Sequence, residues 1–295
     1  MSEFFRLEAP FRGDYVLQRL TFGSGEPVVS LVAGIHGNEV NGTYALNLLA
    51  GVLRVQRPRG TVHLLPLVNV FGAEEGRKRS PYEDRDLNDA FPGVVDGPPA
   101  ERIAAAVLRA TEGGVAIDVQ SGSSVIHEVP HARSPLSGAG LELARAAGLS
   151  VVWKRPMDRM HGLVGAWVAA GQRALVVRGG RGGSLDPDDA RAMGRARVRI
   201  LAGTGSLPSQ EPALPTMVTP EVRDYRSGVG GFFVPEIRPG DRAQAGQLLG
   251  VVRAAVGGEP MEEIRAEAAG IVLGVRVYPL AHARELLVRV AEPTA

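Results

Sequence analysis

The residues best suited to chemistry lie in the segment GIHGNE (34–39), where two residues separate His36 from Glu39. An imidazole and a carboxylate at this spacing, on a turn between a strand and a helix, can converge on one Zn²⁺ ion. Such an ion needs a third protein ligand and keeps one position for water. An H-x-x-E pair is also common by chance, so a capping glutamate beside a solvent-facing histidine is the alternative interpretation.

The composition narrows the classes of function. The sequence contains no cysteine, which excludes disulfides, thiolate metal sites and a cysteine nucleophile. Its formal net charge of +1 indicates no general affinity for nucleic acid or for an anionic membrane. We find no membrane-spanning apolar stretch and no signal peptide in the sequence. We therefore expect a cytoplasmic protein with a small-molecule or peptide ligand, and we leave homo-oligomerisation open.

The elements that would position the His36 and Glu39 pair alternate between strands and helices. The run PVVSLVA (27–33) is continuously apolar, as in a strand buried on both faces of a parallel sheet. Asp186-Pro187-Asp188-Asp189 has the acidic residues and proline that belong in the first turn of a helix. Other strands are expected at 61–69, 115–119 and 173–178, and other helices at 101–110 and 163–170. This alternation predicts an α/β fold with a mixed, mostly parallel sheet flanked by helices.

The alternation stops after Gly203, where the segment TGSLPSQEPALP is rich in proline, serine and glycine. Short β-like runs separated by glycines follow it, with the turn spacing of a small all-β sandwich or barrel. We therefore predict an α/β domain at 1–205 and a small C-terminal all-β domain at 212–295.

Four motifs resemble, in order and spacing, the succinylglutamate desuccinylase/aspartoacylase family of zinc carboxypeptidase-like hydrolases. They are GIHGNE (34–39), PLVN (66–69), RSPYEDRDLNDAFPG (79–93) and AIDVQSG (116–122). The segment GGFFVPEIRPGDRAQAGQLLG (230–250) is also similar to the small β-domain of this family. The resemblance implies a zinc carboxypeptidase-like fold. It also implies hydrolysis of an amide next to a carboxylate, as in an N-acyl amino acid, with zinc and a general-base glutamate.

The resemblance also implies roles for individual residues. His36 and Glu39 match the first two metal ligands of the family. Arg79 matches an arginine that stabilises the developing oxyanion, a role that its fixed cationic fork suits. Asn88 matches an asparagine that helps to bind the substrate carboxylate.

Three positions depart from the family's pattern. Gln120 stands where a histidine completes the metal site, and its neutral amide oxygen is a poor zinc ligand that suits harder cations better. Asp89 stands where an arginine binds the substrate carboxylate. Arg178 stands where the catalytic glutamate is expected, and an arginine cannot act as a general base. The expected cofactor is therefore zinc at a weakened site of His36, Glu39 and Gln120, another divalent metal, or none.

Asp89 and Arg178 exchange one acidic and one basic group within what is expected to be one pocket. Our hypothesis is that they form an ion pair across the pocket or make it selective for an amine. Two side chains that lie far apart and outside one cleft would contradict it.

Two further histidines follow Gln120 in SSVIHEVPHARSP (123–135). His127 and His131, with Glu128 between them, are close enough in sequence for a loop to return one of them to the metal site. We favour the alternative that they are solvated loop histidines. The other three, His63, His161 and His282, are expected to be structural.

Three functional hypotheses follow. The first is a divergent zinc-dependent deacylase with altered or impaired hydrolysis, in which Glu39, Glu128 or a metal-bound hydroxide replaces the missing base. The second is a non-catalytic pseudo-hydrolase that binds a small molecule, peptide or protein partner through the former cleft. In the third, Arg79 and Arg178 bind an anionic group such as a phosphate or dicarboxylate for a different reaction.

Overall fold

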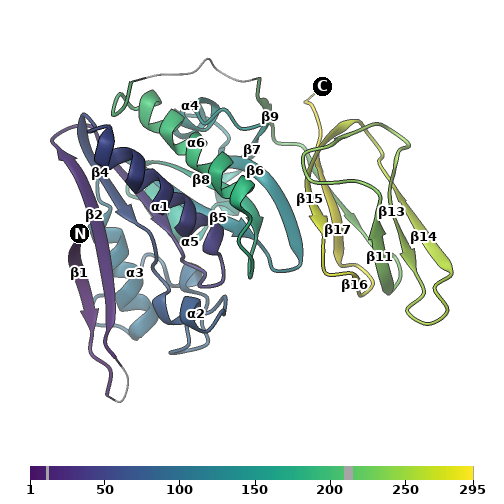
Figure 1. Cartoon of the computed structure of the whole chain (residues 1–295), viewed down its shortest axis with the longest axis horizontal. Helices are drawn as coiled ribbons and strands as arrows, with labels where there is room; N and C mark the ends of the chain where they lie inside the picture. Colours follow the sequence, from purple (N-terminus) through teal and green to yellow (C-terminus); the bar gives the residue numbers. More distant parts are fainter. Residues whose placement is uncertain (11–12, 209–214, 295) are drawn as a thin grey trace.

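The protein is described by a computed structural model that covers residues 1–10, 13–208 and 215–294 (Figure 1). The strands of the first two thirds are β1 (Ser2–Leu7), β2 (Tyr15–Ser24), β3 (Val28–Ala33), β4 (Gly60–Leu65), β5 (Val115–Gly122), β6 (Ile126–Pro135), β7 (Val151–Arg155), β8 (Arg173–Arg181) and β9 (Met217–Thr219). The helices are α1 (Val40–Val55), α2 (Val70–Glu74), α3 (Pro99–Ala110), α4 (Ala139–Ala146), α5 (Gly162–Ala169) and α6 (Pro187–Gly203), with 3-10 turns η1 (Leu87–Ala90) and η2 (Met157–Arg159).

The sheet of this region has a parallel centre. Strands β4, β3, β5 and β8 lie side by side in parallel, and β6 adds antiparallel to β8. At the other edge, β2 pairs antiparallel with β4 and β1 pairs antiparallel with β2. The sheet is therefore mixed and mostly parallel through its centre, as the sequence predicts.

Both faces of the sheet are covered by helices, which is why its central strands are apolar along most of their length. Every residue of β5 is buried, and so is nearly all of β3. Helices α1, α4 and α6 pack on one face, where they share a core with Leu31 and Ile117. Helices α2, α3 and α5 cover the other face around Val32 and Ala116 (Figure 1). The predicted α/β architecture is confirmed.

Helix α6 begins where its acidic first turn predicts. Asp186 is the N-cap, and its carboxylate accepts hydrogen bonds from the backbone N–H groups of Asp188 (3.0 Å) and Asp189 (3.1 Å). Pro187 occupies the first helical position, where no intrahelical N–H bond is lost. By contrast, Glu39 stands at the N-cap of α1 without a side-chain cap, because its carboxylate is bonded elsewhere.

The C-terminal part is built entirely from strands in the described residues. These are β10 (Val222–Arg226), β11 (Gly231–Pro235), β12 (Arg242–Ala243), β13 (Leu248–Arg253), β14 (Pro260–Arg265), β15 (Gly270–Arg276), β16 (Leu280–Ala281) and β17 (Leu286–Ala291). Strands β14, β13, β11 and β16 form a four-stranded sheet, while β15 and β17 continue the large sheet through the pairing of β15 with β6 (Figure 1). The predicted domain start at 212 lies outside the described residues, so the domain limits stay a prediction.

One segment differs from the sequence interpretation. Residues 126–135, expected as a loop, form the long strand β6, which joins β8, β7 and β15. Buried and half-buried residues alternate along part of β6, as in a strand, but its prolines and histidines hide this pattern in the sequence. None of the helices within residues 1–10, 13–208 and 215–294 combines the length and the apolar character of a membrane span.

Candidate active-site cleft

The carboxyl ends of three parallel strands bring the predicted residues together. Strand β3 leads into the turn that carries His36, β5 carries Gln120, and β8 carries Arg178. In the register of β5 and β8, Gln120 lies directly opposite Arg178. Ligands of open α/β sheets bind at this edge, so the location agrees with a functional site.

The backbone of GIHGNE needs both of its glycines. Gly34 has φ +66°, which L-residues with a side chain rarely adopt. A Cβ atom at Gly37 would lie 2.2 Å from the carbonyl carbon of Gly72, so only glycine fits beside α2. The tight turn fixes the direction in which His36 leaves the sheet.

A cleft of about 290 Å³ lies at this edge of the sheet. Of the predicted site residues, His36, Asn88, Asp89, Gln120 and Arg178 line it. Other residues lining it are Lys78, Asp86, Asp118, Arg133, Arg155, Arg159, Met160, His161, Val164 and Val176. Sequence reasoning missed Asp86, Arg155 and Arg159 as site residues, although RDLND and KRPMDR carry a visible concentration of charge.

His36 lies between two carboxylates. Its Nδ1 is 2.7 Å from Oε1 of Glu39, and its Nε2 is 2.9 Å from Oδ1 of Asp86. Burial alone would lower the pKa of His36, but the charge of Glu39 and the hydrogen bonds to both carboxylates raise it to about 9. The second oxygen of Glu39 accepts the backbone N–H of Ser121, and Lys78 pairs with Asp86 at 2.7 Å. Each ring nitrogen of His36 therefore faces a carboxylate oxygen, and both contacts favour the protonated form of the ring.

Gln120 is held by its neighbours on both sides of the amide. Its Oε1 accepts a hydrogen bond from Nη1 of Arg178 at 2.8 Å, and its Nε2 donates to Oδ2 of Asp118 at 2.6 Å. Asp118 is fully buried, and burial together with the nearby charge of Glu39 raises its pKa to about 7. The atom that would bind a metal at position 120 is therefore already an acceptor for a permanent cation.

Glu128, on β6, is the main partner of Arg178. Nε of Arg178 lies 2.5 Å from Oε2 of Glu128, while Oε1 of the same carboxylate lies 3.3 Å from Arg133 and 3.2 Å from Arg289. Burial by itself would raise the pKa of Glu128, but Arg178 and Arg133 hold it well below its usual range. One buried carboxylate thus pairs with three arginines, one of them from the C-terminal strand β17.

The sequence hypothesis for Asp89 and Arg178 offers two alternatives, an ion pair across the pocket or a pocket selective for an amine. Both residues line one cleft, as the hypothesis requires. Among the described residues, however, Arg178 is paired with Glu128 and not with Asp89. Asp89 lies exposed on η1, where its backbone oxygen accepts from Arg85 at 3.4 Å and its carboxylate forms no ion pair within the described part of the chain. The ion pair across the pocket is therefore not formed, and an unpaired carboxylate lines the cleft.

Two other predicted residues occupy less central positions. The Oδ1 atom of Asn88 accepts the backbone N–H of Leu163 at 3.1 Å, which joins η1 to the start of α5. Arg79 is exposed, its Nη1 donates to the backbone oxygen of Asp84 at 2.7 Å, and it is not among the described residues that line the cleft. An oxyanion role for Arg79 stays a prediction.

The predicted ligand set fits a zinc ion poorly at one of its three members. His36 and Glu39 already face each other at 2.7 Å, and the second ring nitrogen of His36 is held by Asp86, an arrangement common among metal-binding histidines. Gln120 offers only an amide oxygen, which already accepts from Arg178. Arginine keeps its charge at any relevant pH, so Arg178 opposes a second cation at this position.

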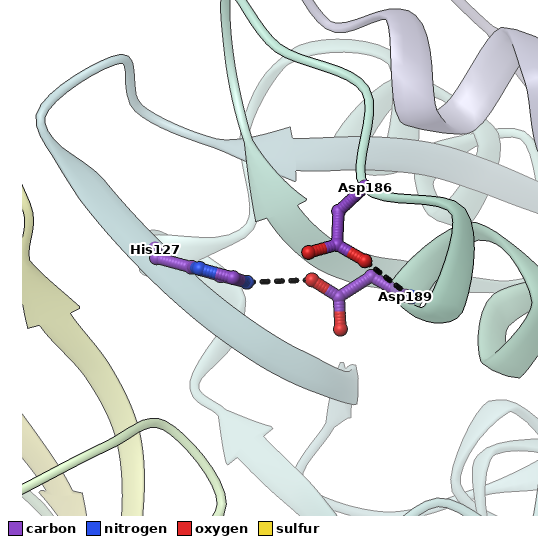
Figure 2. A group of neighbouring side chains, drawn as sticks. All are labelled: His127, Asp186 and Asp189. Atoms are coloured by element: carbon purple, nitrogen blue, oxygen red, sulfur yellow. Dashed lines mark hydrogen bonds and ion pairs between the residues drawn. The ribbon is translucent and has the colours of Figure 1, made fainter.

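A different group of side chains could hold a metal ion. His127, Asp186 and Asp189 each offer one ligand atom within 4.8 Å of the others (Figure 2). His127 and Asp189 form a direct pair at 2.6 Å, which raises the pKa of His127. Asp186 also caps α6. This His-Asp-Asp group is therefore a candidate metal site that the sequence interpretation did not identify.

The structure corrects the expectation of a solvated His131. This residue is 0% exposed on β6, where Nδ1 donates to the backbone oxygen of Val129 at 2.9 Å. Its Nε2 accepts a hydrogen bond from Nε of Arg133 at 3.1 Å. Burial and the charge of Arg133 lower the pKa of His131 to about 3, so the ring is neutral. His127 is only partly exposed and is paired.

We predict that His131 lowers the stability of the folded protein as the pH falls below about 6.5, before ordinary carboxylates begin to titrate. Its folded pKa lies below the unfolded value of about 6.5, so the unfolded chain binds the proton more tightly. Its contribution to stability is present above about pH 6.5 and is lost as the pH falls toward about 3. At about pH 5 the loss should be about 2 kcal/mol, measurable by urea denaturation at several pH values.

The variant His131→Gln keeps an acceptor for Arg133 but cannot titrate, so the difference in stability between parent and variant should change by about 2 kcal/mol between about pH 6.5 and pH 5, and the contribution of Asp118 cancels in this difference. His282→Gln, at an exposed position of the C-terminal part, is the matched control and should keep the slope. An unchanged slope in His131→Gln would contradict the assignment.

Comparison with known proteins identifies related sequences and folds. The sequence model of the succinylglutamate desuccinylase/aspartoacylase catalytic domain matches residues 26–204. The N-alpha-acetyl-L-2,4-diaminobutyric acid deacetylase of Halomonas elongata is 34% identical over 110 residues, which are 37% of this chain and 32% of that protein. The match therefore spans about a third of the curated relative's length.

Solved structures with the same fold cover nearly the whole chain. The product-bound ectoine utilization protein EutE (DoeB) from Ruegeria pomeroyi has a TM-score of 0.83 at 23% identity, over 98% of this chain and 94% of that chain. A succinylglutamate desuccinylase/aspartoacylase from Rhodobacter sphaeroides has a TM-score of 0.81 at 20% identity, over 96% and 91%. At these identities the likeness establishes the fold, including the C-terminal β region.

Proposed function

Because the chain belongs to the succinylglutamate desuccinylase/aspartoacylase family, we propose that its cleft binds an N-acyl amino acid or a similar small amide while metal-dependent hydrolysis is impaired. The observation that carries the proposal is the hydrogen bond from Arg178 to Gln120, because it places a permanent cation on the predicted third metal ligand. The family is one of deacylases, so an acylated small molecule is the ligand class to expect.

The impairment has two physical parts. Metal binding at His36, Glu39 and Gln120 is weakened, because the third ligand is neutral and is bonded to Arg178. The general base is lost at position 178, because a guanidinium accepts no proton. Glu128, a candidate replacement base, forms ion pairs with three arginines, which hold its pKa low and make it a weak base.

What remains in the cleft supports binding. His36, Gln120 and Arg178 are held by several hydrogen bonds, so the binding surface is preorganised. The Halomonas relative is a deacetylase of an Nα-acetylated diamino acid, which supplies a first compound to test. A non-catalytic binding protein is the second candidate, favoured by the same Arg178 pairing.

The first experiment measures metal content and ligand binding on the same protein. Elemental analysis of protein purified without added metal should give far less than one zinc per chain, and Zn²⁺ or Mn²⁺ should not raise its melting temperature. Calorimetry with Nα-acetyl-L-2,4-diaminobutyrate should show binding, with no metal-dependent release of acetate.

Near-stoichiometric zinc together with zinc-dependent acetate release would overturn the proposal. In that case two variants locate the ion. Loss of zinc in His36→Gln would place it in the cleft, whereas loss of zinc in His127→Gln would place it at the His127, Asp186 and Asp189 group.

A further inference from the structure

Three charged side chains that line the cleft form no ion pair among the described residues. They are Arg155 at the end of β7, Arg159 on η2 and Asp89 on η1. The side chain of Arg155 donates to the backbone oxygen of Arg159, at 3.4 Å, and stacks on the Trp153 ring at 4.5 Å. Two guanidinium groups and one carboxylate are thus available to a ligand.

The other cationic side chains of the cleft have ion-pair partners. Lys78 is paired with Asp86, which also contacts His36. Arg133 and Arg178 share Glu128. Arg155, Arg159 and Asp89 therefore remain available to a ligand, and they offer two positive charges and one negative charge.

Arg155 carries its positive charge close to other arginines. It is partly buried, and this burial, together with the nearby charges of Arg289 and Arg159, lowers its pKa. A carboxylate between Arg155 and Arg159 would relieve this repulsion and form charge-assisted hydrogen bonds.

The carboxyl group of Asp118, which also lines the cleft, has one oxygen that lacks a partner among the described residues. Oδ1 of Asp118 is buried with no hydrogen-bond partner in the described part of the chain, and the residue is 1% exposed. A buried acceptor without a donor costs free energy, which a ligand N–H group at this wall would recover. An amide N–H is such a donor.

We propose that the cleft selects a small amide that carries one carboxylate and one ammonium group, with the carboxylate at Arg155 and Arg159 and the ammonium at Asp89. The inference rests on the proposed function and adds the charge pattern of the ligand. A volume of about 290 Å³ limits the ligand to metabolite size. A second carboxylate on the ligand is disfavoured by the unpaired carboxylate of Asp89.

The experiment compares four compounds by calorimetry on the full-length protein. Nα-acetyl-L-2,4-diaminobutyrate has both charges, N-acetyl-2-aminobutyrate lacks the ammonium, and the carboxamide of the first compound lacks the carboxylate. N-acetylaspartate carries a second carboxylate instead. Each single loss of charge should weaken binding by about tenfold, and N-acetylaspartate should bind most weakly.

Variants assign each charge to its residue. Asp89→Asn should weaken binding of Nα-acetyl-L-2,4-diaminobutyrate about tenfold and leave binding of N-acetyl-2-aminobutyrate unchanged. Arg159→Gln should weaken binding of Nα-acetyl-L-2,4-diaminobutyrate and of N-acetyl-2-aminobutyrate and leave the carboxamide unchanged. Asp96→Asn and Arg109→Gln, at exposed positions that do not line the cleft, are the matched controls and should bind like the parent.

The outcomes separate the two levels of the proposal. If N-acetyl-2-aminobutyrate or N-acetylaspartate binds as tightly as Nα-acetyl-L-2,4-diaminobutyrate, the proposed charge pattern of the ligand is wrong, while the proposed function stands. If none of the four amides binds, both are overturned. If Asp89→Asn and Arg159→Gln lose affinity equally for every compound, the assignment of the two ends is wrong.

Discussion

Replacing Glu128 with glutamine should lower the free energy of unfolding by about 3–5 kcal/mol, the usual cost of removing one partner from a buried ion pair. Glu128 is 3% exposed and accepts from Arg178, Arg133 and Arg289. Glutamine keeps the size and one acceptor, but it leaves three guanidinium groups facing one another with only Asp224 still paired to Arg289. Urea denaturation followed by circular dichroism measures the change.

A matched control separates this effect from the loss of any glutamate. Glu142 is 70% exposed on α4, and its pair with Arg145 spans 3.6 Å at the surface. Glu142→Gln should change stability by less than about 0.5 kcal/mol, as exposed pairs usually do. A loss below about 1 kcal/mol in Glu128→Gln would contradict the view that this carboxylate neutralises the cluster.

The double variant tests the pairing itself. If Arg178 is the main partner, Arg178→Met should cost much less in the Glu128→Gln background than in the parent, because the cation it removes is then already unpaired. Additive effects would mean that Arg133 and Arg289, and not Arg178, carry the interaction with Glu128.

The sequence predicts the frame of the site well, for reasons that are local. The apolar run of β3 has few alternatives to a buried strand, and the cap at Asp186 is a short-range signal. Parallel strands place their carboxyl ends at one edge, so His36, Gln120 and Arg178 could be expected to meet.

The partners of these residues depend on long-range pairing that no local pattern encodes. Glu128 reaches Arg178 only because β6 runs antiparallel to β8, with His131 opposite Arg178. Pro130 and Pro135 make that segment look like a loop. The hypothesis that Asp89 pairs with Arg178 correctly placed both in one cleft but did not include Glu128, a carboxylate from another strand that is the actual partner.

Arg289 illustrates the same limit at larger sequence distance. It lies on β17 of the C-terminal part, contacts Glu128 at 3.2 Å and pairs with Asp224 at 2.7 Å. Its guanidinium also lies 5.2 Å from the centre of the Trp153 ring, over which Arg133 and Arg155 are placed too. The C-terminal strands therefore take part in the electrostatics of the cleft wall, which the sequence division at 205–212 did not suggest.

Zinc binding should appear only when the ligand and the charge at the metal site are changed together. In Gln120→His alone, Arg178 remains beside Glu39 and Asp118, so its cation still opposes Zn²⁺. In Gln120→His with Arg178→Glu, a second imidazole and an added carboxylate restore a site of ordinary zinc chemistry. His127→Gln is added to every protein compared, so that the group of His127, Asp186 and Asp189 cannot bind zinc. Zinc at about 100 times its Kd should then stabilise the Gln120→His, Arg178→Glu protein by about 2.7 kcal/mol, while the parent and the single variant show no effect.

The metal-free double variant should be less stable than the parent, because the new carboxylate at position 178 would join those of Glu39, Asp118 and Glu128 in a buried region that has lost its central cation. Zinc-dependent recovery measured by urea denaturation therefore reports the site directly, without relying on turnover. Adding Asp89→Arg tests whether deacylase activity toward N-acetylaspartate follows.

Zinc stabilisation of Gln120→His alone would show that the missing imidazole, and not the charge of Arg178, weakens the metal site. Failure of the double variant to respond would remove His36 and Glu39 as metal ligands of this chain.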